Sequence, residues 1–184
     1  MASARKGLLL LLACSILAGC NGIGEDLSPS GTDRRPPVAA GTVGPFVGQV
    51  APDFTLPSTL GDNVTLSTTL VGRRAAVLYF SMWCPVCDEH MSHMRNSVMP
   101  LYPGVAFLAI DYVSGSVAEA RANEVANGYA GSGFTVLADL GNPVLRAYAA
   151  TMGTTVVVDN TGVVRMNEDY GNGTVLLSTL AGLP

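Results

Sequence analysis

Four apolar runs lie between residues 75 and 159, and glycine, proline or polar residues bound each of them. Short runs rich in valine, isoleucine, leucine and phenylalanine are typical of buried strands. The predicted strands are AAVLYF at 75–80, VAFLAI at 105–110, FTVLA at 134–138 and TTVVVD at 154–159. Two shorter segments, DFTL and NVTL, lie on either side of the turn GDN and predict a hairpin before the first of these strands.

Helical signals separate the strands. Ser116 and Glu119 have the spacing of a capping box, and Asn142 stands as an N-cap before Pro143 at the first helical position. A tight turn at 160–162 predicts that the last strand returns as a hairpin, and a final helix is expected near the C-terminus. This order indicates an α/β fold with a central mixed sheet flanked by helices, and the early hairpin is an N-terminal extension.

The first twenty residues predict export. Arg5 and Lys6 precede the apolar run GLLLLLACSILA, which is too short to span a bilayer and has the length of a secretory signal core. The run ends in LAGC at 17–20, which resembles the bacterial lipobox. That resemblance implies a lipoprotein signal peptide over 1–19, cleavage before Cys20, and acylation of Cys20.

The segment after this cysteine is rich in Gly, Pro, Ser and Thr, so we expect a flexible tether over 20–45 and one domain over 46–184. The chain has 10 Lys and Arg against 14 Asp and Glu, and the signal removes two of the basic residues. The mature protein is therefore acidic, and no basic patch favours nucleic acid. We expect the domain on the extracytoplasmic side of a membrane, held there by the lipid.

Only two of the four cysteines remain as thiols in the mature domain. Cys14 lies in the signal and Cys20 is the predicted lipidation site, which leaves Cys84 and Cys87. One pair cannot form a disulfide framework, and a zinc site of four cysteines would need a second pair. Export past the cytosolic reductants permits an oxidised pair. A dithiol that can exchange is the leading interpretation.

The stretch WCPVC predicts where these thiols lie. Cys84 is expected at the N-cap of a helix and Pro85 at the first helical position, where a missing N–H costs nothing. Unpaired amides and the helix dipole would then favour the thiolate of Cys84 and lower its pKa. Cys84 is the predicted attacking nucleophile, Cys87 one turn later the resolving thiol, and Trp83 a shield on the flank of the pair.

Three segments in order, GQVAPDFTLPSTLGDNVTLS, VLYFSMWCPVC and TTVVVDNTGVV, resemble the thioredoxin-like redoxin superfamily, in particular membrane-tethered thiol–disulfide oxidoreductases of the bacterial envelope. The resemblance covers nearly all of the chain from Val47 and extends to the alkyl hydroperoxide reductase and thiol-specific antioxidant family. It implies a thioredoxin fold, Cys84 as nucleophile and Cys87 as resolving thiol, without a cofactor. It also implies protein thiol or disulfide substrates and an upstream membrane redox partner.

Two positions depart from that family pattern. Gly153 stands where such oxidoreductases place a cis-proline and peroxiredoxins an arginine, so we expect a trans bond between Met152 and Gly153. Leu78 stands where thioredoxins carry a buried acid that helps move the proton of the second cysteine. Nearby candidates for that task are the helix residues Asp88, Glu89 and His90.

A second enzymatic reading is a peroxiredoxin-like peroxidase. The Pro-X-X-X-Thr-X-X-Cys neighbourhood that binds peroxide in that family corresponds here to Val77, Ser81 and Cys84. Only the hydroxyl of the threonine is retained, which favours disulfide exchange over peroxide reduction.

A third reading is a copper-binding chaperone or redox sensor, because thiol, thioether and imidazole groups share one short helix and soft sulfur suits Cu(I). These groups belong to Cys84, Cys87, His90, Met91, His93 and Met94. However, Cys87, Met91, Met94 and Val98 recur with the spacing of an apolar helix face packed on a sheet. We therefore expect the methionines in the core, the histidines at the surface, and no bound metal.

Overall fold

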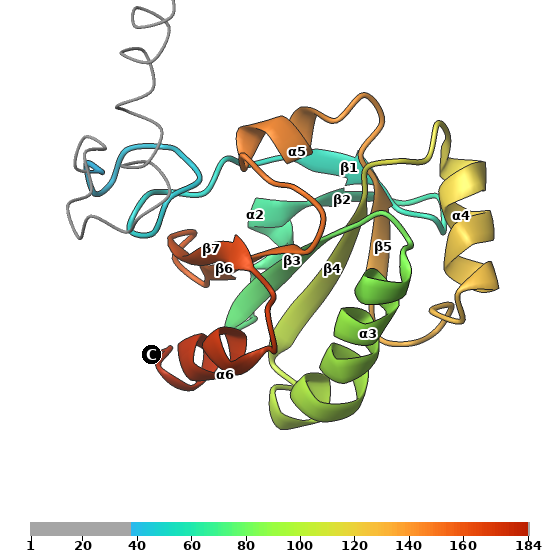
Figure 1. The fold of residues 1–184 in the computed structure, drawn as a ribbon. Coiled ribbons are helices and arrows are strands. Elements are labelled where there is room, and N and C mark those ends of the chain that lie inside the picture. The colour runs from blue at the N-terminus through green and yellow to red at the C-terminus, as the bar shows by residue number, and fades with distance from the viewer. Residues whose placement is uncertain (1–37, 184) are drawn as a thin grey trace, which may run out of the picture. The chain divides into compact units, whose positions relative to one another are not determined.

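A computed structural model describes residues 38–183, and a five-stranded mixed sheet is the centre of this unit (Figure 1). Its strands lie in the order β5-β4-β3-β6-β7. They are β3 (Ala75–Ser81), β4 (Val105–Asp111), β5 (Thr135–Ala138), β6 (Thr154–Asp159) and β7 (Val164–Asp169). β3, β4 and β5 run parallel, and β6 pairs antiparallel with both β3 and β7. The predicted mixed sheet and its closing hairpin are confirmed.

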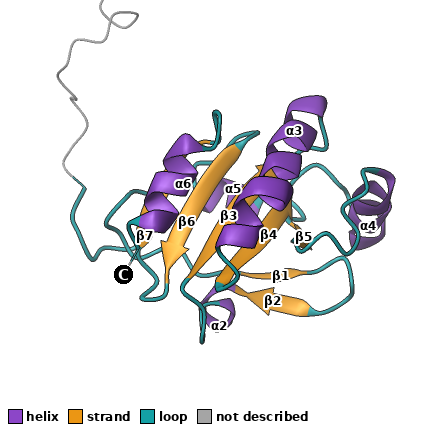
Figure 2. Cartoon of the chain, turned by 90° about the horizontal axis from the view of Figure 1, so that it is seen from below, coloured by secondary structure: helices purple, strands orange, loops and turns teal. Residues whose placement is uncertain are grey.

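Helices cover both faces of the sheet, and α3 and α6 lie together on one of them (Figure 2). The helices are α2 (Leu66–Thr69), α3 (Pro85–His93), α4 (Val117–Ala126), α5 (Pro143–Ala147) and α6 (Thr174–Ala181). A π-helical turn at Met94–Val98 and a 3₁₀ turn at Met99–Leu101 extend α3. Residues of α2 and α5 pack on the opposite face.

Both faces of β3 are buried, which explains why its sequence is apolar without alternation. Ala75, Val77 and Tyr79 belong to the core layer under α3 and α6. Ala76, Leu78 and Phe80 belong to the layer under α2 and α5. β3 therefore passes through the middle of the domain and delivers the segment that follows it, including Cys84, to one end of the sheet.

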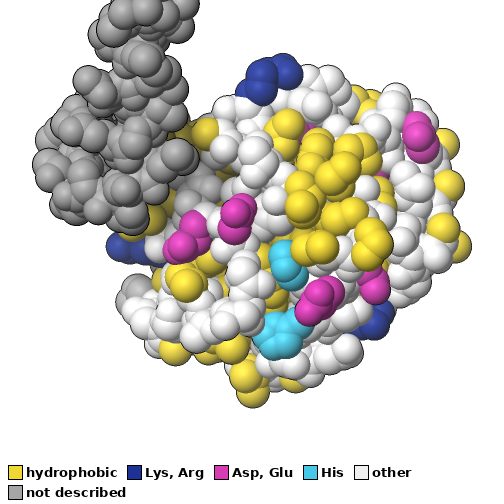
Figure 3. Space-filling model, viewed as in Figure 1, with side chains coloured by type: hydrophobic (Ala, Val, Ile, Leu, Met, Phe, Trp, Pro, Cys, Tyr) yellow, Lys and Arg dark blue, Asp and Glu magenta, His cyan; other side chains and the backbone are white. Residues whose placement is uncertain are grey.

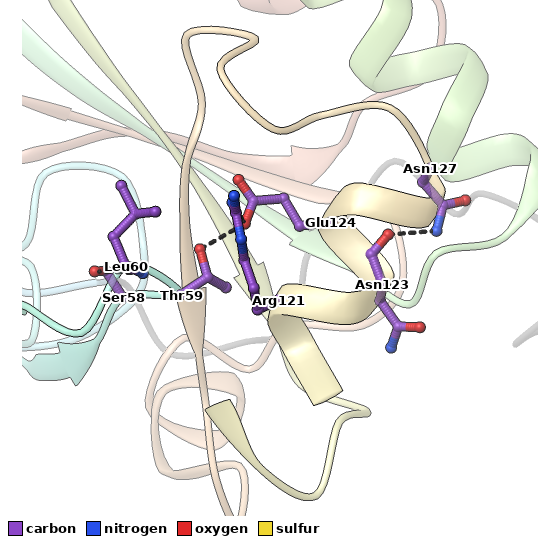
Figure 4. Close-up of polar contacts among 7 residues, drawn as sticks. All are labelled: Ser58, Thr59, Leu60, Arg121, Asn123, Glu124 and Asn127. Atoms are coloured by element: carbon purple, nitrogen blue, oxygen red, sulfur yellow. Dashed lines mark hydrogen bonds and ion pairs between the residues drawn. The ribbon is translucent and has the colours of Figure 1, made fainter. Parts of the chain in front are cut away.

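The predicted hairpin forms a separate two-stranded sheet of β1 (Thr55–Pro57) and β2 (Asn63–Thr65). A buried carboxylate ties the loop of this hairpin to α4 (Figure 4). Glu124 is only 3% exposed; its Oε2 accepts a hydrogen bond from Thr59 at 2.6 Å and pairs with Arg121 at 2.7 Å. A buried carboxylate is tolerated only with such partners, so we interpret this cluster as structural.

Local signals set the starts of two helices. Ser116 caps α4, and its side chain accepts a hydrogen bond from the backbone N–H of Glu119. Asn142 occupies the N-cap position of α5 as predicted, but it has φ 61° and its side chain does not cap the helix. The carboxylate of Asp139 accepts hydrogen bonds from the backbone N–H groups of Val144 and Leu145 instead.

The described unit begins at Val38, so it includes the last residues of the segment expected to be a tether. The carbonyl of Pro45 accepts a hydrogen bond from Asn167, and Gly48 donates to the carbonyl of Val164. The predicted signal peptide, Cys20 and the rest of the tether up to residue 37 lie outside the described residues. Within residues 38–183, no helix is long and apolar enough to cross a membrane.

Candidate functional site

The two thiols meet at the start of α3. Cys84 is the N-cap with extended backbone, and Pro85 is the first helical residue, as predicted. The Sγ atoms of Cys84 and Cys87 are 2.7 Å apart, and Cys84 Sγ accepts a hydrogen bond from the backbone N–H of Cys87 at 3.2 Å. Both cysteines are free thiols in this structure. Formation of a disulfide between them requires little movement of the chain.

The hydrogen bonds around the pair favour the thiolate on Cys87. Burial alone raises the pKa of Cys87, but hydrogen bonds from the Cys84 thiol, the backbone of Met82 and Cys84, and the Tyr79 hydroxyl outweigh it and lower the pKa. Partial burial and the hydrogen bond to Cys87 raise the pKa of Cys84, against the backbone N–H groups of Cys87 and Val86. These directions are opposite to the prediction that Cys84 has the lower pKa.

The two sulfur atoms also differ in solvent exposure, and this difference favours Cys84 as the nucleophile. Cys87 is 1% exposed and packs in the core under α3, whereas Cys84 is partly exposed. An external disulfide reaches Cys84 and is kept from Cys87. Access therefore supports the assignment of Cys84 as nucleophile, and the order of the pKa values does not.

Trp83 is fixed beside the pair by a buried acid. Its indole Nε1 donates to Asp111 Oδ2 at 2.7 Å, and its backbone N–H donates to Ser81 Oγ at 3.2 Å. Trp83 has φ 57°, a conformation that bulky residues rarely adopt without support from their surroundings. Asp111 is fully buried at the end of β4, and the sequence does not indicate its contact with Trp83 because 28 positions separate the two residues.

Gly153 lies next to the site with a trans peptide bond, as predicted, since the described residues contain no cis bond. It has φ 83°, in the left-handed region that favours glycine. Its N–H donates to the carbonyl of Phe80 and its carbonyl accepts from the N–H of Tyr170, each at 3.0 Å. Both backbone groups are used inside the domain and are not available to pair with a substrate.

Tyr79, and not Leu78, lies on the face of the sheet that carries Cys87. Leu78 lies in the core layer on the opposite face of the sheet from Cys87. Tyr79, the next residue, lies on the Cys87 face, where its hydroxyl hydrogen-bonds His90 Nδ1 at 3.0 Å and helps to lower the pKa of Cys87. The carboxylate of Asp88 accepts instead from Tyr129 at 2.6 Å.

Most side chains considered for peroxide binding or metal binding are buried and make contacts within the domain. Ser81 is fully buried, and its Oγ accepts the backbone N–H of Trp83. The apolar face of the helix is confirmed, with all four of its members no more than 1% exposed: Cys87, Met91, Met94 and Val98. Among the described residues, no group of three or more His, Cys, Asp or Glu could hold a metal.

Both histidines reach the surface as expected, but each is partly buried. His90 hydrogen-bonds the hydroxyl of Tyr79, and His93 Nδ1 hydrogen-bonds the hydroxyl of Tyr170. The helix packs its polar side against aromatic residues of the sheet and of the loop after β7, which sequence spacing alone does not reveal.

A broad hydrophobic area lies on the face that carries these histidines (Figure 3). Apolar side chains on the segments around the cysteines are between 37% and 46% exposed: Met82, Val86, Val113, Leu140 and Met152. Met82 and Val86 flank Cys84 in the sequence, and Met152 precedes Gly153. Exposed apolar patches of this kind mark interaction sites.

Three solved structures with similar folds have names that refer to disulfide or peroxide chemistry. A candidate protein disulfide isomerase from Bacteroides thetaiotaomicron has TM-score 0.63 and 22% identity, covering 75% of this chain and 89% of its own. Peroxidoxin BcpB from Mycobacterium tuberculosis has TM-score 0.60 and 20% identity, covering 75% and 97%. A secreted M. tuberculosis disulfide oxidoreductase homologous to E. coli DsbE has TM-score 0.54 and 20% identity, covering 71% and 96%.

These likenesses establish a thioredoxin-like fold. No protein with a curated description matches the sequence. The model of the AhpC/TSA family matches residues 47–167, which include β1 to β6, both cysteines, Trp83 and Gly153. The chain belongs to the AhpC/TSA family, within the thioredoxin-like redoxin superfamily.

Proposed function

We propose that this protein is a thiol–disulfide oxidoreductase that exchanges disulfides with protein substrates through Cys84 and Cys87. The observation that carries the proposal is the arrangement of the pair: a partly exposed sulfur at a helix start and a buried sulfur 2.7 Å behind it. In such a pair, the outer thiolate attacks a substrate disulfide and the inner one attacks the resulting mixed disulfide. The protein cysteines gain a disulfide as the substrate disulfide is reduced, and the reverse reaction oxidises substrate thiols.

The surface around Cys84 supports a polypeptide as the substrate. The exposed side chains of Met82, Val86 and Met152 can contact apolar residues beside a substrate cysteine. Because the backbone groups of Gly153 are hydrogen-bonded inside the domain, affinity for a substrate comes mainly from side-chain contacts and not from backbone pairing. Two of the similar structures have names that refer to disulfides, and one of these proteins is secreted.

The proposal is tested by comparing how fast a protein disulfide and hydrogen peroxide oxidise the reduced protein. Because the Ser81 hydroxyl is fully buried and out of reach of a peroxide at Cys84, a denatured disulfide-containing protein should oxidise the pair much faster than hydrogen peroxide does. Stopped-flow tryptophan fluorescence and thiol titration measure both rates, with the Cys84→Ser, Cys87→Ser double variant as control. Faster oxidation by peroxide would assign the protein to the peroxidases of its family.

We also propose that the domain is extracytoplasmic and lipid-anchored through Cys20, on the basis of the LAGC sequence. The wild-type protein should fractionate with membranes and carry an acylated N-terminal Cys20, as measured by mass spectrometry. Cys20→Ala should be released or left unprocessed, because the acyl chains and not the domain hold the protein at the membrane. An unmodified N-terminus downstream of Cys20 in the wild-type protein would contradict the anchor.

A further inference from the structure

Cys87 faces a difficulty in the second half of the exchange reaction. When Cys84 attacks as the thiolate, the proton that the pair shares is left on Cys87, and it has to leave a side chain that is 1% exposed before Cys87 can attack in turn. Two residues at the expected positions do not take this proton: the Asp88 carboxylate accepts a hydrogen bond from Tyr129, and Leu78 lies on the other face of the sheet. Tyr79 lies in the same core layer as Cys87, and its hydroxyl is near enough to Cys87 to lower the pKa of that thiol.

Tyr79 connects Cys87 to the surface through His90. The Tyr79 hydroxyl lies 3.0 Å from His90 Nδ1, and the two rings meet edge to face with centroids 6.0 Å apart. His90 is partly exposed, and Figure 3 shows the histidine side chains at the surface beside the hydrophobic area. A hydroxyl both donates and accepts, so it can pass a proton between two neighbours without movement of the heavy atoms.

We propose that Tyr79 and His90 form the proton relay that activates Cys87 for resolution of the mixed disulfide. This inference rests on the proposed disulfide exchange. The Cys87 thiol gives its proton to Tyr79 Oη as the Tyr79 hydroxyl gives its own proton to His90 Nδ1. Cys87 Sγ then attacks Cys84 Sγ, the bond between Cys84 and the substrate sulfur breaks, and the substrate leaves as a thiolate. The two electrons pass from the dithiol to the substrate, and the proton passes from His90 to water.

The surroundings of both relay residues suit this role. Burial lowers the pKa of His90 and His93 lowers it further, while Glu89 and Asp169 oppose this, so the neutral ring can accept a proton at neutral pH. Burial, and then the charge of Cys87, raise the pKa of Tyr79, so this hydroxyl passes its proton on rather than losing it. The ring of Tyr170, with its centroid 4.6 Å from that of His90, keeps the imidazole in place.

Reaction with Ellman's reagent distinguishes the attack by Cys84 from the attack by Cys87, because each attack releases one thionitrobenzoate. When the full-length reduced protein reacts with Ellman's reagent, Cys84 attack releases one thionitrobenzoate and Cys87 attack on the mixed disulfide releases the second. Tyr79→Phe should slow the second release about tenfold or more at pH 7, as expected for loss of a general base, and should change the first release far less. The rate of the second release should then continue to rise with pH where the native rate is level. His90→Gln should give the same slowing, and the double variant should be no slower than either.

Tyr148→Phe is the matched control. Tyr148 is fully buried on the opposite face of the sheet, and its hydroxyl donates to the carbonyl of Pro52 at 2.7 Å. Both of its release rates should equal the native ones. A native second release in Tyr79→Phe, or equal slowing in Tyr148→Phe, would overturn the relay. A native protein that releases two thionitrobenzoates but exchanges with no protein disulfide would overturn the proposed function instead.

Discussion

Replacing Cys84 by serine is expected to abolish disulfide exchange, whereas Cys87→Ser should attack a substrate once and remain attached to it through Cys84. The reason is access: Cys84 is partly exposed at the start of α3, and Cys87 is 1% exposed beneath it. Without the second thiol, nothing in hydrogen-bond contact with Cys84 can attack the mixed disulfide. Mass spectrometry of the Cys87→Ser protein after incubation with a disulfide substrate should show a covalent adduct at Cys84.

Thiol labelling of the two single variants provides the control. The Cys87→Ser protein should react with an alkylating reagent faster than the Cys84→Ser protein near neutral pH, because its remaining thiol is the accessible one. Its thiolate also keeps the hydrogen bonds from the helix start, and it no longer shares a proton with Cys87. Faster labelling of Cys84→Ser would assign the attack to Cys87 and contradict the roles given to both cysteines.

The pKa expected for Cys84 considered alone does not apply when its thiol is in contact with that of Cys87. A helix start favours the thiolate of Cys84 when Cys84 is considered alone. In the reduced pair, the donors around Cys87 and the Cys84 thiol itself place the negative charge on the inner sulfur. Coupled groups titrate together, so the first proton lost belongs to the pair. Access then decides which sulfur meets the substrate.

Much of the fold could be predicted from the sequence because its strands are continuous apolar runs. The predicted strands at 75–80, 105–110, 134–138 and 154–159 each agree with the structure to within one residue at either end. The start of α3 was predictable for a similar reason, because a proline after Cys84 leaves few other places for a helix to begin.

The side chains around Cys87 could not be predicted in the same way. A strand buried on both faces has no alternation, so its sequence does not indicate that Tyr79 rather than Leu78 lies under α3. His90 has the position of a surface residue on a helix considered alone. Its contact with Tyr79 depends on how α3 crosses β3, which is set by packing between segments distant in the sequence.

The largest effect on stability is expected from Asp111→Ala, which should lower the free energy of unfolding by about 3–5 kcal/mol. The carboxylate of Asp111 is fully buried and accepts four hydrogen bonds, from the Trp83 indole, the backbone N–H groups of Val113 and Ser114, and the Ser114 hydroxyl. Truncation leaves these donors without their acceptor, and each one that is buried and unsatisfied costs about 1–3 kcal/mol before the structure relaxes. Urea unfolding followed by circular dichroism measures the loss.

Glu168→Ala is the control for removal of an acidic side chain, because Glu168 is exposed on β7 and its truncation should change stability by no more than about 0.5 kcal/mol. Asp111→Asn should fall between the two, since the amide keeps one acceptor oxygen but adds a donor that faces other donors. The tryptophan fluorescence of Asp111→Ala should also change, because Trp83 is the only tryptophan in the chain and loses its indole partner. A loss of stability below about 1 kcal/mol would show that the loop before α3 holds its left-handed Trp83 without the buried acid.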